Sequence, residues 1–159
     1  MTATPRTDDK TRGFTLVELL VVVVLIGILA GIAIPIFLHT TNKAEDAKAT
    51  SDLRNLAGVE EGYATESTTT SYGTAAELAA ASQLSVSSQD TVYVYTAGVA
   101  GYCLVGHSDS SDRFLVYDSR GGGMQAPKST LAAAQAVCTD AGYTAGGSLV
   151  SDSSGTHAS

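Results

Sequence analysis

A long, uninterrupted apolar stretch near the N-terminus limits what this chain can fold into. Residues 12–38 read RGFTLVELLVVVVLIGILAGIAIPIFL, and residues 19–38 contain no charged side chain. At about 1.5 Å of rise per residue, a helix over residues 19–38 would cross a hydrocarbon layer of roughly 30 Å. We therefore expect a helix that lies in a membrane or inside a bundle of helices.

Glu18 is the acid at the start of this apolar stretch. An uncompensated carboxylate within lipid costs on the order of 2.5 to 3.5 kcal/mol, so such a group needs a partner, a proton or a place near the membrane surface. Residues 19–38 supply no partner. Two interpretations stay open: Glu18 lies at the level of the lipid headgroups, or it pairs with a positive charge on another molecule.

Residues 12–37, RGFTLVELLVVVVLIGILAGIAIPIF, resemble the class III leader and N-terminal helix of type IV pilins and of the related type II secretion pseudopilins. The resemblance implies that a prepilin peptidase cleaves after Gly13 and methylates the new N-terminal amine of Phe14. It also implies that Glu18 neutralises this amine on a neighbouring subunit of a filament, and that Pro35 is the proline of the family's helix.

The leader expected at residues 1–13 is short, polar and mixed in charge. A secretory signal peptide places its apolar run before the cleavage site, whereas here the run follows the site. Cleavage would therefore remove the leader and keep the anchor, residues 14–38. An ordinary single-pass membrane protein with a cytoplasmic N-terminus would show a similar pattern. Both interpretations place the rest of the chain outside the cytoplasm.

Within the anchor, Gly27 and Gly31 form a G-x-x-x-G pattern, which lets two helices approach closely in a membrane. Pro35 removes a backbone donor and leaves a carbonyl near Gly31 without its usual hydrogen bond. We expect the helix to be weakest between Gly27 and Pro35. A mild proline kink is expected in the isolated protein, and we hypothesise that the segment bends or unwinds on passing from lipid into a filament.

The helix is expected to continue over residues 39–66 in an amphipathic form. Ala49, Leu53, Leu56, Glu60 and Tyr63 recur at helical spacing, and the face with Ala49, Leu53, Leu56 and Tyr63 is expected to lie on a sheet. The polar TESTTTS run should end the helix near residue 66. The charged residues expected to face water are Glu45, Asp46, Lys48, Asp52, Arg54 and Glu61.

Residues 67–143 predict an α+β head. A linking segment at residues 67–90, with a short helix in AAELAAASQL, is followed by strands at residues 91–96, 101–107 and 113–119, whose spacing suits an antiparallel meander. Residues 131–138 are expected to form a short helix or an edge segment. The sheet would pack on the amphipathic helix in two layers. Residues 144–159 are rich in Gly, Ser and Thr and are expected to form a flexible tail.

The two cysteines, Cys103 and Cys138, lie beyond the anchor. In an exported domain such a pair indicates a disulfide, whereas in the cytosol two free thiols are more usual. The pattern of a cysteine in GYCLVGH and a second, later cysteine also resembles the disulfide-bounded region of pilin heads.

Several classes of function are disfavoured by the composition. A formal charge of -7, with 16 acids against 9 bases, argues against nucleic acid as a direct partner. The sequence contains neither G-x-S-x-G nor H-E-x-x-H, so we predict no enzyme. We also predict no metal and no cofactor, because two cysteines without CxxC spacing and three histidines make a poor ligand set. Some pseudopilins bind calcium in a loop of the head, so Asp109, Asp112 and Asp118 are considered as calcium ligands. They do not follow EF-hand spacing, and we favour their interpretation as solvated turn acids.

These observations together predict a structural subunit of a type IV pilus, used for adhesion, motility or DNA uptake. The precursor would be held in the lipid of the inner (cytoplasmic) membrane with its head outside, and its partners would be prepilin peptidase, the pilus assembly machinery and further copies of itself in an extracellular filament. Two alternatives stay open: a pseudopilin of a type II secretion or competence system, and a single-pass membrane protein with an extracellular domain.

Overall fold

The computed structural model of the chain describes residues 13–68, 71–81, 86–87, 90–108, 112–152 and 155–158. The chain divides into two compact units, Met1–His39 and Thr40–Ser159. The first unit holds the apolar stretch and the second holds the head. The boundary between the units lies one residue beyond the predicted end of the anchor.

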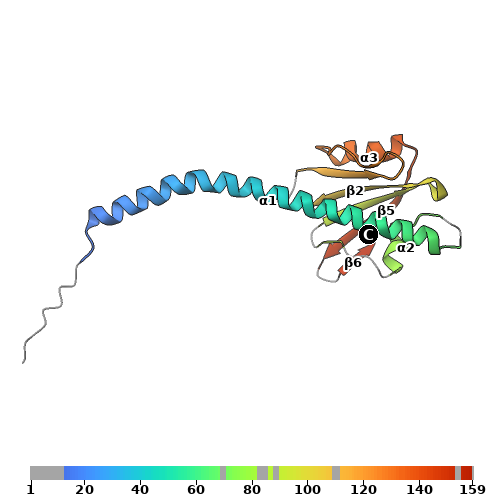
Figure 1. Ribbon diagram of the computed structural model, residues 1–159, viewed down its shortest axis with the longest axis horizontal. Coiled ribbons are helices and arrows are strands. Elements are labelled where there is room, and N and C mark those ends of the chain that lie inside the picture. Colours follow the sequence, from blue (N-terminus) through green and yellow to red (C-terminus); the bar gives the residue numbers. More distant parts are fainter. Residues whose placement is uncertain are drawn as a thin grey trace, which may run out of the picture. The chain divides into compact units, whose positions relative to one another are not determined.

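The colours of Figure 1 follow the elements along the chain. The helices of the described residues are α1 (Leu16–Glu66), α2 (Ala75–Ala80) and α3 (Leu131–Asp140), with a 3-10 turn, η1, at Gly98–Ala100. The strands are β1 (Asp90–Thr96), β2 (Tyr102–Ser108), β3 (Phe114–Asp118), β4 (Gly123–Met124), β5 (Thr144–Asp152) and β6 (Gly155–Ala158). The α+β class is confirmed, and α1 ends where the sequence predicts.

The residues of α1 that belong to the second unit bury one face. The predicted face of Ala49, Leu53 and Leu56 is confirmed, since each is at most 4% exposed, and Tyr63 packs half-buried against the same core. β2 approaches this face closely at Gly106, where a Cβ atom would lie only 3.0 Å from Leu53 Cγ. Glycine therefore lets the helix and the sheet come into contact at this point.

The expectation that Asp52 faces water is wrong. Its side chain is 6% exposed, and its two carboxylate oxygens accept hydrogen bonds from the backbone N–H of Ser87 at 2.7 Å and from the Ser87 hydroxyl at 3.1 Å. A buried carboxylate is tolerated when hydrogen bonds satisfy it. Asp52 thus fixes the chain to α1 shortly before β1 begins.

The strands form one sheet in the order β4-β3-β2-β1-β5-β6, and all of its pairs are antiparallel. The three predicted strands are β1, β2 and β3, and they form the predicted meander. Cys103 stands opposite Tyr95 on one neighbouring strand and opposite Asp118 on the other.

The expectation of a flexible tail over residues 144–159 is wrong for the described residues. β5 pairs with the edge of β1 that the meander leaves open, and β6 pairs with β5. Gly147 has a φ of +101°, and the β1–β5 register shifts between Tyr93 and Tyr95. Glycine here permits a bulge that keeps the strand paired. Residues 153–154 and 159 lie outside the described part.

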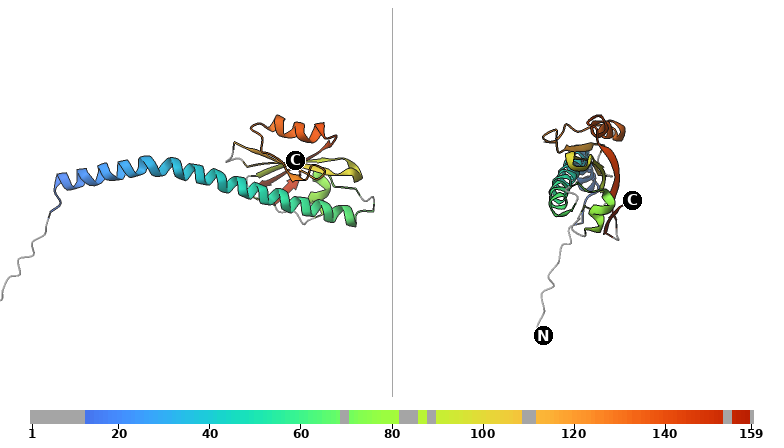
Figure 2. Two further views of the ribbon diagram at one scale, coloured as in Figure 1. Left: turned by 45° about the horizontal axis from the view of Figure 1, so that its top comes forward. Right: turned by 90° about the vertical axis from the view of Figure 1, so that its right-hand side faces the viewer.

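The head has a core on each side of the sheet, as Figure 2 shows with α3 on one face and the head portion of α1 on the other. The core on the α1 side gathers buried residues from α1, α2 and the strands, among them Leu53, Leu78 and Leu104. The core on the α3 side is smaller and contains Ala134 and Cys138. The helix interpretation of residues 131–138 is thus the correct one.

Candidate assembly site

The apolar surface of the first unit is the main feature of the candidate site. The large apolar side chains between Phe14 and Leu38 are all exposed, from 47% at Val22 to 83% at Phe14. Contiguous apolar patches of this size mark membrane or protein interaction surfaces. In the described residues, one helix, α1, is long and apolar enough to cross a membrane. This surface requires lipid or other helices to cover it.

Thr15 organises the start of α1. Gly13, Phe14 and Thr15 precede the helix, and the Thr15 hydroxyl accepts a hydrogen bond from the backbone N–H of Glu18 at 3.2 Å. The Leu19 N–H donates to the Thr15 carbonyl at 3.3 Å. Thr15 therefore occupies the N-cap position, which typically contributes about 1 kcal/mol to a helix.

Glu18 lies in the first turn of α1. Its Oε2 stands 3.5 Å from the Thr15 hydroxyl, a long contact, so this threonine restrains the carboxylate only weakly. The unpaired N–H groups of a helix N-terminus favour a negative charge at this place. Glu18 therefore lies at the N-terminal end of α1.

The sequence interpretation missed the role of Thr15. The signal was present as T-x-x-E before an apolar run, the pattern of a helix capping box. In the structure, Glu18 thus has a local role at the helix start in addition to any role between subunits.

Gly27, Gly31 and Pro35 all lie inside α1. A Cβ atom added at either glycine would meet nothing within 4 Å, so this part of the helix surface is open to close approach by another helix. α1 is helical throughout, Pro35 included. The unwinding hypothesised for the segment between Gly27 and Pro35 concerns the assembled state and stays a prediction.

In the head, Cys103 of β2 and Cys138 of α3 form a disulfide, with their Cα atoms 5.7 Å apart. Both cysteines are fully buried. The bond joins positions 35 residues apart, for which chain-entropy estimates give about 3 to 4 kcal/mol of stabilisation. It fixes α3 to the sheet.

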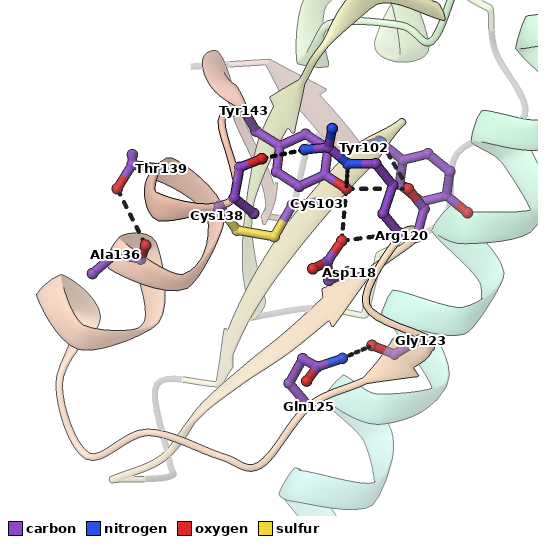
Figure 3. Close-up of a disulfide and its surroundings, with 12 residues drawn as sticks. Tyr102, Cys103, Asp118, Arg120, Gly123, Gln125, Ala136, Cys138, Thr139 and Tyr143 are labelled. Atoms are coloured by element: carbon purple, nitrogen blue, oxygen red, sulfur yellow. Dashed lines mark hydrogen bonds between the residues drawn. A yellow bond between two sulfur atoms is a disulfide. The ribbon is translucent and has the colours of Figure 1, made fainter. Parts of the chain in front are cut away.

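A polar network lies next to the disulfide (Figure 3). The Tyr143 hydroxyl donates to Asp118 Oδ1 at 2.6 Å and accepts from Arg120 Nε at 2.8 Å, while the Arg120 guanidinium lies 4.1 Å from the centre of the Tyr143 ring. Arg120 also donates to the Ala141 carbonyl. The interpretation of Asp118 as a solvated turn acid is wrong, because the residue is 8% exposed and its carboxylate accepts the hydrogen bond from Tyr143.

The positions of the acids and histidines in the described residues bear on metal binding. Within them, no group of three or more His, Cys, Asp or Glu side chains is placed to hold a metal ion. Of the acids considered as calcium ligands, Asp109 lies outside the described residues, Asp112 is exposed, and Asp118 is bonded to Tyr143.

Comparisons with known proteins agree with this geometry. A family model described as the prokaryotic N-terminal methylation motif matches residues 8–34. Type II secretion system core protein G of Escherichia coli K12 is 48% identical over 48 residues, which are 30% of this chain and 33% of that protein. Type IV major pilin protein PilA of Myxococcus xanthus is 39% identical over 61 residues, covering 38% and 28% of the two chains.

A longer match reaches the head. Type IV wide pilus major component PilA4 of Thermus thermophilus is 31% identical over 113 residues, covering 70% of this chain and 86% of that protein. By contrast, this chain spans about a third of the length of the secretion and Myxococcus relatives. The family model thus matches the start of the chain and much of the apolar stretch, and one relative is similar over most of the chain.

Proposed function

The chain belongs to the type IV pilin family, and on that premise we propose that it is the structural subunit of a type IV pilus. The precursor carries a leader over residues 1–13, is held in the membrane by residues 14–38, and polymerises with copies of itself into an extracellular filament. The head then forms the outer surface of the filament, and the apolar helices form its core.

The exposed apolar surface of the first unit carries this proposal. Its large apolar side chains from Phe14 to Leu38 are at least 47% exposed. Removal of apolar surface from water contributes about 25 cal/mol per Å², so helices that leave lipid must pack on one another to keep this surface out of water.

Processing creates the charge that assembly uses. Cleavage after Gly13 by prepilin peptidase frees the amine of Phe14, which lies outside α1 in the structure and is 83% exposed. An α-amino group has a pKa near 7.7 to 8.0 in model peptides and is therefore largely protonated at neutral pH. N-methylation of that amine leaves it basic.

Glu18 is the acceptor of that charge on a neighbouring subunit. It stands in the first turn of α1, and only a weak contact with Thr15 restrains it. In a low-dielectric core a mispaired carboxylate is costly, so pairing Glu18 with the amine of Phe14 sets the register between subunits as well as attracting them. Gly27 and Gly31 permit the close helix approach, and Pro35 marks the place where α1 can bend or unwind.

The proposal fixes a topology that can be tested. Before assembly, α1 crosses the cytoplasmic membrane with its N-terminus inside and the head outside, where the Cys103–Cys138 disulfide can form and persist. After assembly the chain is extracellular.

One experiment tests the whole proposal. Surface material sheared from cells that make this chain should contain filaments by electron microscopy, and mass spectrometry of those filaments should show a chain that begins at a methylated Phe14. Filaments without this chain, or a chain that keeps residues 1–13 in the membrane, would contradict the proposal.

A pseudopilin of a secretion system is the second candidate. The observation that favours it is the identity of 48% to type II secretion system core protein G, higher than the 31% to PilA4. That identity covers only 30% of the chain, whereas the PilA4 match covers 70%. Deletion separates the two: loss of long surface fibres indicates a pilus subunit, and loss of protein secretion with fibres intact indicates a pseudopilin.

A further inference from the structure

Glu60 is a carboxylic acid buried in the core of the head. It lies on α1, is 0% exposed, and belongs to the face that packs on the sheet. Its Oε2 accepts a hydrogen bond from the backbone N–H of Gly73 at 2.8 Å, and its Oε1 has no hydrogen-bond partner among the described residues. Half of this buried carboxyl group is therefore left unsatisfied, which is rare in folded proteins.

The bond to Gly73 holds the α1–α2 loop, residues 71–74, against α1. Gly73 is itself buried, and a Cβ atom there would lie 2.9 Å from Leu78 Cδ2 and 3.2 Å from Tyr63 Cδ1. The backbone thus passes through a space that only glycine fits. Any outward shift of this loop would break the Glu60 bond and admit water to the carboxyl group.

The charges that act on Glu60 are acids. Glu61 of α1 binds the Tyr72 hydroxyl at 3.3 Å, and Glu77 of α2 accepts from the Thr74 N–H at 2.7 Å, so both carboxylates hold the same loop. Tyr72 is the titratable group of the loop itself, and Tyr102 of β2 packs on it with ring centroids 4.8 Å apart. Burial above all, with Glu61 and Glu77, raises the pKa of Glu60 from its ordinary value of 4.5 to about 7, although the Gly73 hydrogen bond opposes the shift.

We propose that Glu60 is a protonation-dependent latch of the α1–α2 loop, closed on Gly73 while the carboxyl group is neutral and opened as that group ionises. In the neutral form, Oε2 accepts the Gly73 hydrogen bond at little cost in solvation. In the ionised form, the same position places a negative charge in a core whose nearest charges are also negative. Opening exposes the carboxylate to water, so ionisation and opening favour each other.

The sign and size of the effect follow from linkage. The closed loop binds the Glu60 proton more tightly than the open loop does, so the open fraction rises with pH between 4.5 and about 7. From pH 5 to pH 8 the opening equilibrium should increase by roughly 10- to 100-fold. Below pH 4.5 and well above pH 7, this contribution should be flat.

Hydrogen exchange at the Gly73 amide tests the latch. The full-length chain in detergent micelles is followed by NMR from pH 5 to pH 8, and each exchange rate is divided by the intrinsic rate to remove base catalysis. We expect the protection of Gly73 to fall roughly 10- to 100-fold over this range in the native protein. In Glu60→Gln, which keeps the shape and the acceptor but cannot ionise, we expect protection to be independent of pH.

Two further variants serve as controls. Glu61→Gln removes a neighbouring like charge, so the fall in protection should persist but move to lower pH. Glu66→Gln lies at the exposed end of α1 and should behave as the native protein does. Equal pH dependence in the native protein and Glu60→Gln would overturn the proposal.

A direct titration keeps the test decisive if Glu60→Gln fails to fold. The ¹³C shift of the Glu60 carboxyl in the native chain should report a midpoint well above 4.5 that coincides with the fall in Gly73 protection. A midpoint near 4.5, or a midpoint unrelated to the loss of protection, would also overturn the latch.

Discussion

At the scale of single residues, Glu18 distinguishes the two states proposed for this chain, anchored in lipid and packed in a filament. In lipid, its place in the first turn of α1 and its weak contact with Thr15 make the carboxylate locally tolerable. In a filament the same group would need the amine of a neighbouring Phe14. A substitution can therefore affect one state and spare the other.

We expect Glu18→Ala to insert in the membrane and to be cleaved normally, but to enter filaments at least about tenfold less than the native chain. In a filament of this variant, the amine of Phe14 would be buried without a partner, at a cost of several kcal/mol. Quantitative immunoblots of membrane and sheared fractions measure this ratio. Glu18→Gln separates the two roles of the residue, because it keeps a polar side chain at the helix start but removes the charge. Normal filament yield from Glu18→Gln would contradict charge pairing.

Tyr143 allows a second test at this scale. Its hydroxyl donates a hydrogen bond to Asp118 and accepts one from Arg120, and Asp118 is almost fully buried. Tyr143→Phe keeps the ring packed under Arg120 but leaves the carboxylate with one partner fewer, so we expect a loss of about 1 to 3 kcal/mol in the free energy of unfolding of the head. Denaturant unfolding with the disulfide intact measures it. An unchanged unfolding midpoint would show that the network is not needed for stability.

The residue scale also shows where sequence reasoning stops. The buried apolar positions of α1 follow from helical periodicity, and Leu53 and Leu56 were predicted on that basis. Asp52 was predicted to face water, and Glu60 shares the helical spacing of the buried face, but no pattern predicts a buried carboxylate at either position. Both are buried, and backbone N–H groups at Ser87 and Gly73 donate hydrogen bonds to them. Those partners lie 35 and 13 residues away in the chain, and no local sequence pattern predicts these contacts.

At the scale of elements, the contact between α1 and β2 depends on a missing side chain. Gly106→Val would place carbon atoms where Leu53 packs, since even a Cβ atom would lie 3.0 Å from Leu53 Cγ. We expect a loss of about 1 to 3 kcal/mol in the free energy of unfolding, typical of overpacked cores. The double variant Gly106→Val with Leu53→Ala should lose less than the sum of the single variants. Additive losses would show that the two positions do not share this space.

The strands show which part of the sheet a sequence can predict. β1, β2 and β3 alternate or run apolar and follow one another through short turns, so the meander is evident from local pattern. β5 is rich in glycine and small polar residues, and its pairing with β1 joins segments about 50 residues apart, such as Tyr93 with Ser148. A composition that is typical of a mobile tail here belongs to a bulged strand. This strand is ordered because it pairs with the open edge of β1.

At the scale of the whole molecule, the stability of the head should depend on pH through Glu60. Its pKa is raised on folding, so the folded state holds the proton more tightly. The contribution to stability is therefore complete below pH 4.5 and is lost as the pH rises to about 7, amounting to roughly 3 kcal/mol at most. Denaturant unfolding of the native chain and Glu60→Gln at pH 4, 5.5 and 7.5 isolates the contribution of Glu60 to the free energy of unfolding. A difference between the two proteins that does not change with pH would contradict it.

Whether the mature chain begins at Phe14 depends on cleavage of the peptide bond after Gly13. Gly13 precedes α1 without a helical conformation, and a Cβ atom there would meet nothing within 4 Å, so Gly13→Val should leave the fold of both units intact. We expect the peptidase to reject the larger side chain, and the uncut chain to stay in the membrane with its disulfide formed but without a free amine at Phe14. Intact-mass measurement of Gly13→Val should show that the leader is retained, and the sheared fractions should lack this chain. The control variant is Gly58→Val, at an open glycine of α1 in the head, and it should be cleaved normally. A Gly13→Val chain found in filaments with its leader attached would show that cleavage and the Phe14 amine are not what drives polymerisation.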